Sequence, residues 1–136
     1  MQLTPRQESP RGDAQGPRLK LDRILAVADG SPGPTGWAFD VRVEGNIVFS
    51  LRNRNYDDDA RSNMYLPLTG ERTNSVISVP QGGSARVAVH GRRSFGSDTA
   101  TGEGVVDDNA GTLEITVKNA RTADDGSFVF YFSVAR

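Results

Sequence analysis

Carboxylate side chains are the groups in this chain that come closest to a chemical motif. Three of them are consecutive, Asp57, Asp58 and Asp59, in a polar stretch without regular periodicity. Calcium takes about six to eight oxygen ligands, several of them from carboxylates, so an acidic run suggests a calcium site. One extended segment cannot direct three consecutive side chains to one ion, and the run lacks the Asp-x-Asp-x-Asp-Gly spacing of a calcium loop. By itself it indicates a solvated acidic loop.

Further aspartates lie in other stretches rich in Gly, Ser and Asp, namely Asp29, Asp98, Asp107 and Asp108. They could gather at one end of a folded domain, but the order of the chain does not show which loops share an end. From the sequence we expect no metal site and no cofactor. If calcium does bind, its candidate ligands are Asp29, Asp57, Asp59 and Asp98.

The sequence contains few of the residues and motifs on which catalytic sites are usually built. His90 is the only histidine, so any histidine chemistry must pass through it, and it falls on the outward parity of its strand. There is no cysteine and no Gly-x-Ser-x-Gly nucleophile motif. A glycoside hydrolase would need a paired acid and base, and no such pair can be identified. We therefore expect a protein that is not an enzyme, with no catalytic residues.

The bulk composition excludes other classes. The 136 residues carry a net charge of −1, with acidic and basic residues interspersed, which argues against binding to nucleic acid. No apolar run approaches the roughly 18 to 20 residues that cross a bilayer, and the polar start lacks the apolar region of a secretory signal. We expect no membrane partner, and a cytoplasmic or virion- or assembly-associated location.

Residues 1–18 differ in composition from the rest of the chain. Proline, glycine and charged residues dominate this stretch, and after Met1 the only large apolar side chain is that of Leu3. Such a composition cannot build a packed element. We expect an extended arm that contacts a protein partner, followed by one domain over residues 19–136. The expected contact residues are Leu3, Pro5, Arg6, Pro10 and Arg11.

The rest of the chain has the pattern of β-strands. A first strand is expected from Leu19, followed by a Gly, Pro and Ser loop. The clearest hairpin comes next, with Gly45-Asn46 as its turn. Its expected inward face is Trp37, Phe39, Val41, Val43, Ile47, Phe49 and Leu51.

The second half continues this pattern. A polar excursion with one edge strand precedes a second hairpin around Pro80-Gln81-Gly82-Gly83, and a Gly and Asp loop is expected over residues 91–104. The final strand alternates at period two, with Phe128, Phe130, Phe132 and Val134 on one face. No window has a helical apolar stripe. The sequence therefore predicts an all-β antiparallel sandwich of about seven or eight strands with an N-terminal arm.

Two families share parts of this pattern. The spacing of Asp124-Asp125-Gly126-Ser127-Phe128-Val129-Phe130 resembles the late strand of immunoglobulin-like sandwiches, and Leu25 and Trp37 stand about as far apart as the first Cys and core Trp of that family. Phe128 and Phe130 replace the Tyr and Cys of the family motif. The resemblance implies a sandwich without the disulfide.

The chain also resembles a C2-like sandwich over about Leu19 to Val134. The shared features include Val79-Pro80-Gln81-Gly82-Gly83 and the late Gly102-x-Gly104-Val105. C2 domains bind calcium through loop carboxylates and dock on anionic membranes, so the resemblance implies these functions. Where the family has an Asp-x-Asp pair, this chain has His90-Gly91-Arg92-Arg93.

Two functional hypotheses follow. The first is a non-catalytic structural or interaction module that docks into a larger protein assembly, for example as a phage virion decoration protein or a component of an injection machine. Its partners would be protein subunits, and a homo-oligomer is one form of such an assembly. The alternative is a C2-like domain that binds calcium or lipid.

Overall fold

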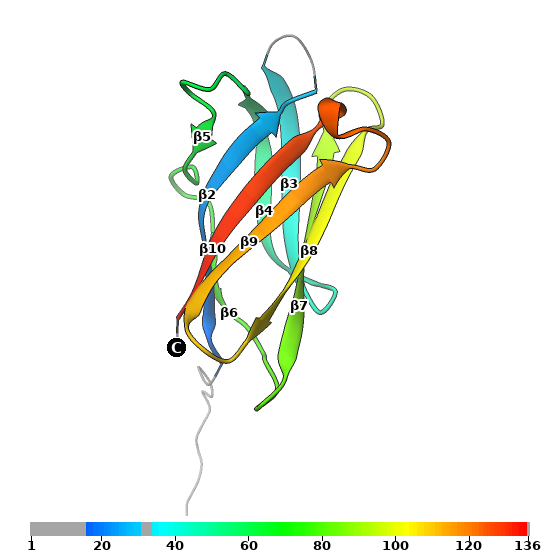
Figure 1. Cartoon of the computed structure of the whole chain (residues 1–136). Coiled ribbons are helices and arrows are strands. Elements are labelled where there is room, and N and C mark those ends of the chain that lie inside the picture. The colour runs from blue at the N-terminus through cyan, green and yellow to red at the C-terminus, as the bar shows by residue number, and fades with distance from the viewer. Residues whose placement is uncertain (1–15, 31–33, 136) are drawn as a thin grey trace, which may run out of the picture.

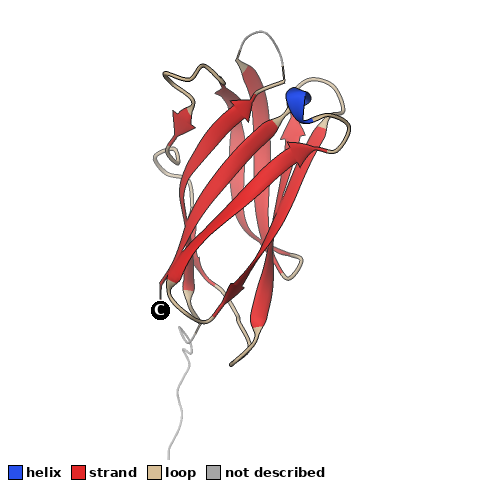
Figure 2. Cartoon of the chain, viewed as in Figure 1, coloured by secondary structure: helices blue, strands red, loops and turns tan. Residues whose placement is uncertain are grey.

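The computed structural model describes residues 16–30 and 34–135. Within them the regular structure is almost entirely β-strand (Figure 1). The strands are β2 Arg18–Ala28, β3 Thr35–Val43, β4 Asn46–Tyr56, β5 Met64–Tyr65, β6 Asn74–Val76, β7 Ser84–Arg93, β8 Thr99–Asp107, β9 Gly111–Asn119 and β10 Ser127–Ala135. A 3₁₀ turn at Ala123–Asp125 precedes the last strand (Figure 2). None of the described residues forms a helix with the length and apolar character needed to cross a membrane.

The strands form two layers that face each other. The sheet order is β4-β3-β7-β8-β9-β10-β2-β5, with β6 also paired to β2, and all of these pairings are antiparallel. One layer is β4-β3-β7-β8 and the other is β9-β10-β2 with β5 and β6 (Figure 1). Among the described strands, the two layers are hydrogen-bonded to each other where Ala100 and Thr101 of β8 pair with Asn119 and Lys118 of β9. The prediction of an all-β antiparallel sandwich is confirmed.

Aromatic side chains fill the space between the layers. Trp37 and Phe39 come from β3, and Phe128 and Phe130 come from β10, so both layers contribute. The centroid of the Phe39 ring lies 4.9 Å from that of Phe130 and 5.1 Å from that of Phe128. Both pairs have the edge-to-face arrangement that aromatic rings prefer. The inward alternation predicted for the final strand is confirmed, because Phe128, Phe130, Phe132 and Val134 are all buried.

The first hairpin has a different turn from the expected one. Val43 pairs with Asn46, so the two turn residues are Glu44 and Gly45. Both have positive φ, 49° and 83°, as a primed hairpin turn requires, and Gly45 supplies the second at no steric cost.

Ile47 also differs from its expected position. The pairing of β3 with β4 shifts between Val41 and Arg42, so Val48 is an extra residue in the ladder. Such a bulge changes which face the neighbouring side chains occupy. Ile47 is 55% exposed, and its expected place on the inward face was wrong.

The glycine-rich stretch over residues 91–104 is mostly strand rather than loop. β7 continues to Arg93, and β8 begins at Thr99. Gly102 and Gly104 lie inside β8 where it passes over β9, and a Cβ at Gly102 would stand 2.1 Å from the carbonyl oxygen of Thr116. These glycines permit a close approach of two backbones, which is the alternative meaning of glycine within a strand.

Candidate functional site

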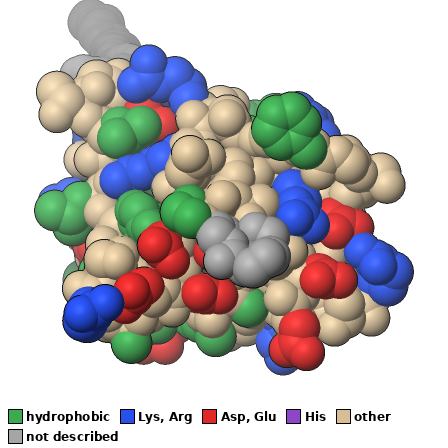
Figure 3. All heavy atoms as spheres, turned by 90° about the horizontal axis from the view of Figure 1, so that it is seen from above, with side chains coloured by type: hydrophobic (Ala, Val, Ile, Leu, Met, Phe, Trp, Pro, Cys, Tyr) green, Lys and Arg blue, Asp and Glu red, His purple; other side chains and the backbone are tan. Residues whose placement is uncertain are grey.

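Four loops meet at the end of the sandwich where β2 finishes (Figure 1). They connect β2 to β3, β4 to β5, β7 to β8, and β9 to β10. One contact at this end joins β7 to the β2–β3 loop: Nη2 of Arg93, the last residue of β7, donates to the carbonyl oxygen of Gly30 at 3.1 Å. Figure 3 looks down on this end and shows acidic, basic and apolar side chains interspersed on it.

Asp29 is the first residue after β2, and its side chain is buried there. The residue is 1% exposed. Its carbonyl oxygen accepts a buried hydrogen bond of 3.0 Å from the indole Nε1 of Trp37, which belongs to the core. The backbone position of Asp29 is therefore set by the most buried part of the sandwich.

Asp57 and Asp58 approach Asp29 from the loop that follows β4. The Asp29 amide donates to Oδ2 of Asp58 at 3.2 Å, and the Asp58 amide donates to Oδ2 of Asp29 at 3.3 Å. The Asp57 amide donates to the Tyr65 hydroxyl at 2.6 Å. These bonds fix the two loops against each other, with Asp57 half-buried and Asp58 exposed.

The result is a cluster of three carboxylates. One oxygen from each of Asp29, Asp57 and Asp58 lies within 4.8 Å of the others. Two negative charges at such a distance repel by about 3 to 4 kcal/mol at an effective dielectric constant near 20. A cation among them would convert this repulsion into attraction, and hard oxygen donors are the ligands that calcium prefers. Burial raises the pKa of the neighbouring Tyr56, which keeps its hydroxyl neutral.

The two other predicted ligands lie elsewhere. Asp59 turns away from the cluster and pairs with Arg61 at 3.4 Å. Asp98 forms ion pairs with Arg121 and, at 3.2 Å, with Arg93. Its hydrogen bonds with these arginines, that from Arg121 foremost, lower the pKa of Asp98. This carboxylate serves to tie the β7–β8 loop to the β9–β10 loop.

Sequence reasoning selected Asp59 and not Asp58 from the acidic run. Asp57 and Asp58 are adjacent, and both reach Asp29 because the chain leaves β4 in a turn rather than in an extended segment, with the Asp59 amide donating to Oδ1 of Asp57 at 3.0 Å. An aspartate that bonds an amide two residues later is a turn signal that composition alone could have suggested.

The remaining predicted residues give no second site. His90 lies opposite Asp40 and Thr101 on the outer face, and its side chain makes no hydrogen bond with another described residue. The expected arm contacts Leu3, Pro5, Arg6, Pro10 and Arg11 fall outside the described residues.

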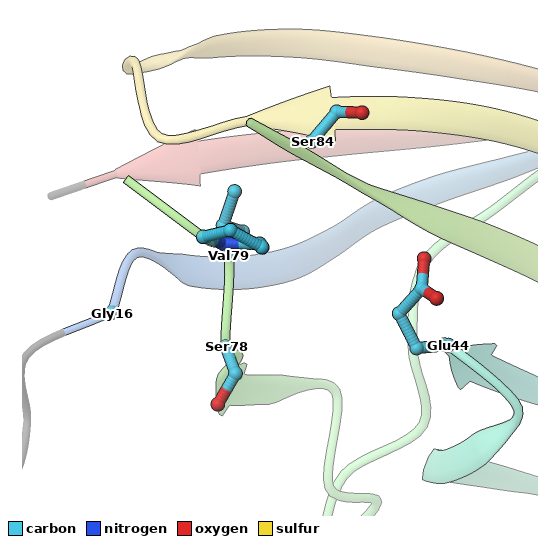
Figure 4. A pocket seen from close by; sticks show the side chains of 6 residues that line it. Gly16, Glu44, Ser78, Val79 and Ser84 are labelled. Carbon is cyan, nitrogen blue, oxygen red and sulfur yellow. The ribbon is translucent and has the colours of Figure 1, made fainter. Parts of the chain in front are cut away.

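A hollow of about 530 Å³ lies at the end of the sandwich opposite to the aspartate cluster. Val79 and Pro80 form its apolar part, and Gly16, Glu44, Ser78 and Ser84 complete its lining (Figure 4). Among the described residues that line it, Glu44 is the one carboxylate.

Comparisons with known proteins give a similarity of fold alone. No family model matches the sequence, and no curated protein matches it. Among solved structures, a C2 domain covers 88% of this chain and 97% of its own length, with 14% identical residues and a TM-score of 0.48. A match of this quality carries no information about what the chain binds. The immunoglobulin-like alternative gains no support from these comparisons.

Proposed function

We propose that this chain is a non-catalytic binding module that takes up calcium at the loop end of its sandwich. The observation that carries the proposal is the convergence of Asp29, Asp57 and Asp58 from two loops, with oxygens within 4.8 Å of one another. Asp29 would be the anchoring ligand because the fold fixes it through Trp37. Backbone carbonyls and water would supply the remaining oxygens that calcium takes.

A calcium titration of thermal stability tests this proposal. A ligand that binds only the native state raises its stability by about 2.7 kcal/mol at one hundred times the dissociation constant, which corresponds to several degrees in Tm. Terbium offers a second readout, because Trp37 and Tyr65 lie beside the cluster and could sensitise its luminescence. We expect calcium to displace the terbium.

The variant Asp58→Asn distinguishes a cation-binding role of Asp58 from a purely structural role in the loop. In chelator-treated protein it removes one repelling charge and keeps an acceptor for the Asp29 amide, so we expect its Tm to equal or exceed that of the wild type. In millimolar calcium the order should reverse. Asp107→Asn, in the β8–β9 hairpin at the other end, is the matched control and should respond to calcium as the wild type does. An unchanged wild-type Tm at millimolar calcium would exclude the proposal.

A second function, membership of a larger protein assembly, is favoured by an apolar row on the outer face of β5, β2 and β10. The register places Met64 opposite Leu25, and Leu25 opposite Val129. Val27 and Leu66 add exposed apolar surface at 51% and 67%. Rows of this kind on one sheet face mark surfaces that bind proteins. A virion shell or an injection machine is an assembly in which copies of such a module would meet.

Sedimentation velocity on the full chain tests this second function. Self-association across the outer face should increase with protein concentration and be lost in the double variant Val27→Lys, Met64→Lys. Both side chains are exposed, so these changes should leave the fold intact. A protein that stays monomeric at about 200 μM, far above the micromolar range of weak specific complexes, would count against an assembly of its own copies.

A further inference from the structure

The outer face of the β4-β3-β7 layer is hollowed over Ala38. In the register, Ala38 of β3 lies opposite Arg92 of β7. On its other side a bulge places both Arg52 and Asn53 of β4 opposite this one residue. A single methyl group therefore stands among longer side chains, and the surface sinks between them.

Two adjoining hollows lie on this face. The larger, of about 290 Å³, is lined by Ala38, Asn53, Arg92, Arg93 and Ser94. The smaller, of about 160 Å³, shares Ala38 and Arg92 and continues along the same face to Asp40, Ser50 and His90. Sites for small molecules measure about 300 to 1,000 Å³, so each hollow by itself falls below this range. A ligand would have to span both.

Ser94 and Asn53 form a fixed wall of the larger hollow. The Ser94 amide donates to the carbonyl oxygen of Gly36 at 2.9 Å, and the Ser94 hydroxyl bonds Oδ1 of Asn53. Arg93 beside them is held by Asp98 at 3.2 Å. Because these groups are held in place by the fold, a ligand that binds here need not order them.

Arg92 is the cation of this face that is left for a ligand. Its guanidinium makes no hydrogen bond or ion pair with another described residue, whereas that of Arg93 is paired with Asp98. Arginine binds a carboxylate through two parallel hydrogen bonds. The charge of the two hollows is therefore complementary to one carboxylate at Arg92.

The smaller hollow offers hydrogen-bonding groups of low net charge. The register sets Ser50, Asp40 and His90 side by side across three strands, at the separation at which opposite side chains interact. Asp40 is already paired with Arg42 at 2.9 Å, so it suits a hydroxyl donor better than a second cation. A hydroxyl, an imidazole and a paired carboxylate can all form hydrogen bonds with the hydroxyl groups of a sugar.

We propose that this outer face binds a sugar acid, with its carboxylate on Arg92 and its ring hydroxyls in the smaller hollow. A sugar acid carries a carboxylate and several hydroxyls on one small ring, which is the combination that the two joined hollows accommodate. The proposal goes beyond calcium binding, because none of the residues that line these hollows belongs to the aspartate cluster.

A nuclear magnetic resonance titration of the full chain with glucuronate tests the proposal. The protein is treated with chelator, so that calcium at the aspartate cluster cannot attract the carboxylate. We expect the amide signals of Ala38, Arg92 and Ser94 to shift and to saturate in the millimolar range. Glucose, which has the ring hydroxyls but no carboxylate, should give no saturable shift at the same concentrations.

Three variants assign the binding to this face. Arg92→Gln should weaken glucuronate binding at least about tenfold, because it removes charge-assisted hydrogen bonds. Arg86→Gln is the matched control and should bind as the wild type does, since Arg86 is exposed on the same strand and pairs with Glu103 at 3.6 Å. Ala38→Leu fills the hollow without changing the charge and should also weaken binding. Circular dichroism and Tm show whether each variant keeps the fold.

Three results would overturn the proposal. The first is a set of shifts that do not saturate by about 50 mM glucuronate, far weaker than a millimolar complex. The second is equal weakening by Arg92→Gln and Arg86→Gln, because it would show attraction by net charge alone. The third is binding of acetate or inorganic phosphate as tight as that of glucuronate, because the sugar ring would then contribute nothing.

Discussion

Phe130 is the residue at which the two layers of the sandwich depend most directly on each other. It is fully buried on β10, and its ring contacts Phe39 of the opposite layer at 4.9 Å and Phe132 of its own strand at 6.2 Å. Aromatic packing through Phe130 therefore connects the two layers.

Replacing Phe130 with Ala should therefore be among the most damaging single changes. Truncation of a buried phenylalanine costs about 3 to 5 kcal/mol through lost burial and the cavity left behind. Phe95→Ala is the matched control, because Phe95 is 86% exposed and its loss should change stability by no more than about 0.5 kcal/mol. Urea unfolding of both variants measures the difference. Equal effects would contradict the assignment of the core.

The cluster of Asp29, Asp57 and Asp58 shows what can be foreseen at this scale. The sequence identified Asp29 and Asp57 as candidates from residue type and loop composition. It could not show that the β2–β3 and β4–β5 loops share an end, because that depends on strand order in space. Asp98 was predicted as a ligand but lies outside the cluster. It pairs instead with two arginines that are 5 and 23 residues away in the chain, and their proximity also depends on the arrangement of strands in space.

At the scale of elements, strands with simple alternation were predictable. The exceptions were glycine and bulge positions and the second expected hairpin, which was wrong because β6 pairs with β2 of the other layer and not with β7. The final strand follows period two and was predicted correctly. Gly102 was assigned to a loop because glycine usually marks one, yet it sits in β8 where Thr116 leaves no room for a side chain. Ile47 was misplaced by a bulge. Both cases depend on contacts with a neighbouring strand, which local sequence does not contain.

Asp98 links two loops, and this link should make stability depend on pH. Its pKa is lowered in the folded state by the hydrogen bonds with Arg121 and Arg93. A lowered pKa means that the stabilisation is complete above the unfolded value of about 3.9 and is lost as the pH falls through the folded value. Asp98→Asn should thus lower Tm at pH 7, and the difference from the wild type should shrink toward pH 2.

Thermal melts of the wild type and of Asp98→Asn between pH 2 and pH 7 measure this effect. Asp107→Asn serves again as the control, because the hydrogen bond of the Asp107 side chain among the described residues is local, from the Asn109 amide of its own hairpin. A constant difference between wild type and Asp98→Asn at every pH would show that the loss comes from packing rather than from charge.

The whole molecule has two unlike ends joined by one core. Carboxylates and ion pairs gather where β2 finishes, and apolar hollows lie beside the β3–β4 turn at the other end. The buried residues between the two ends form a single packed cluster.

The same single core predicts how the molecule unfolds. Trp37 is fully buried on β3 and lies 5.4 Å from Phe128 of the opposite layer, so its fluorescence reports on the contact between the layers. Far-ultraviolet circular dichroism reports on the strands themselves. Because neither layer can keep its apolar face buried without the other, we expect both signals to give one coincident urea transition, with a slope of about 1 to 3 kcal/mol per molar urea. Loss of the tryptophan signal before the strand signal would mean that the layers separate first, and that the sandwich is not one cooperative unit.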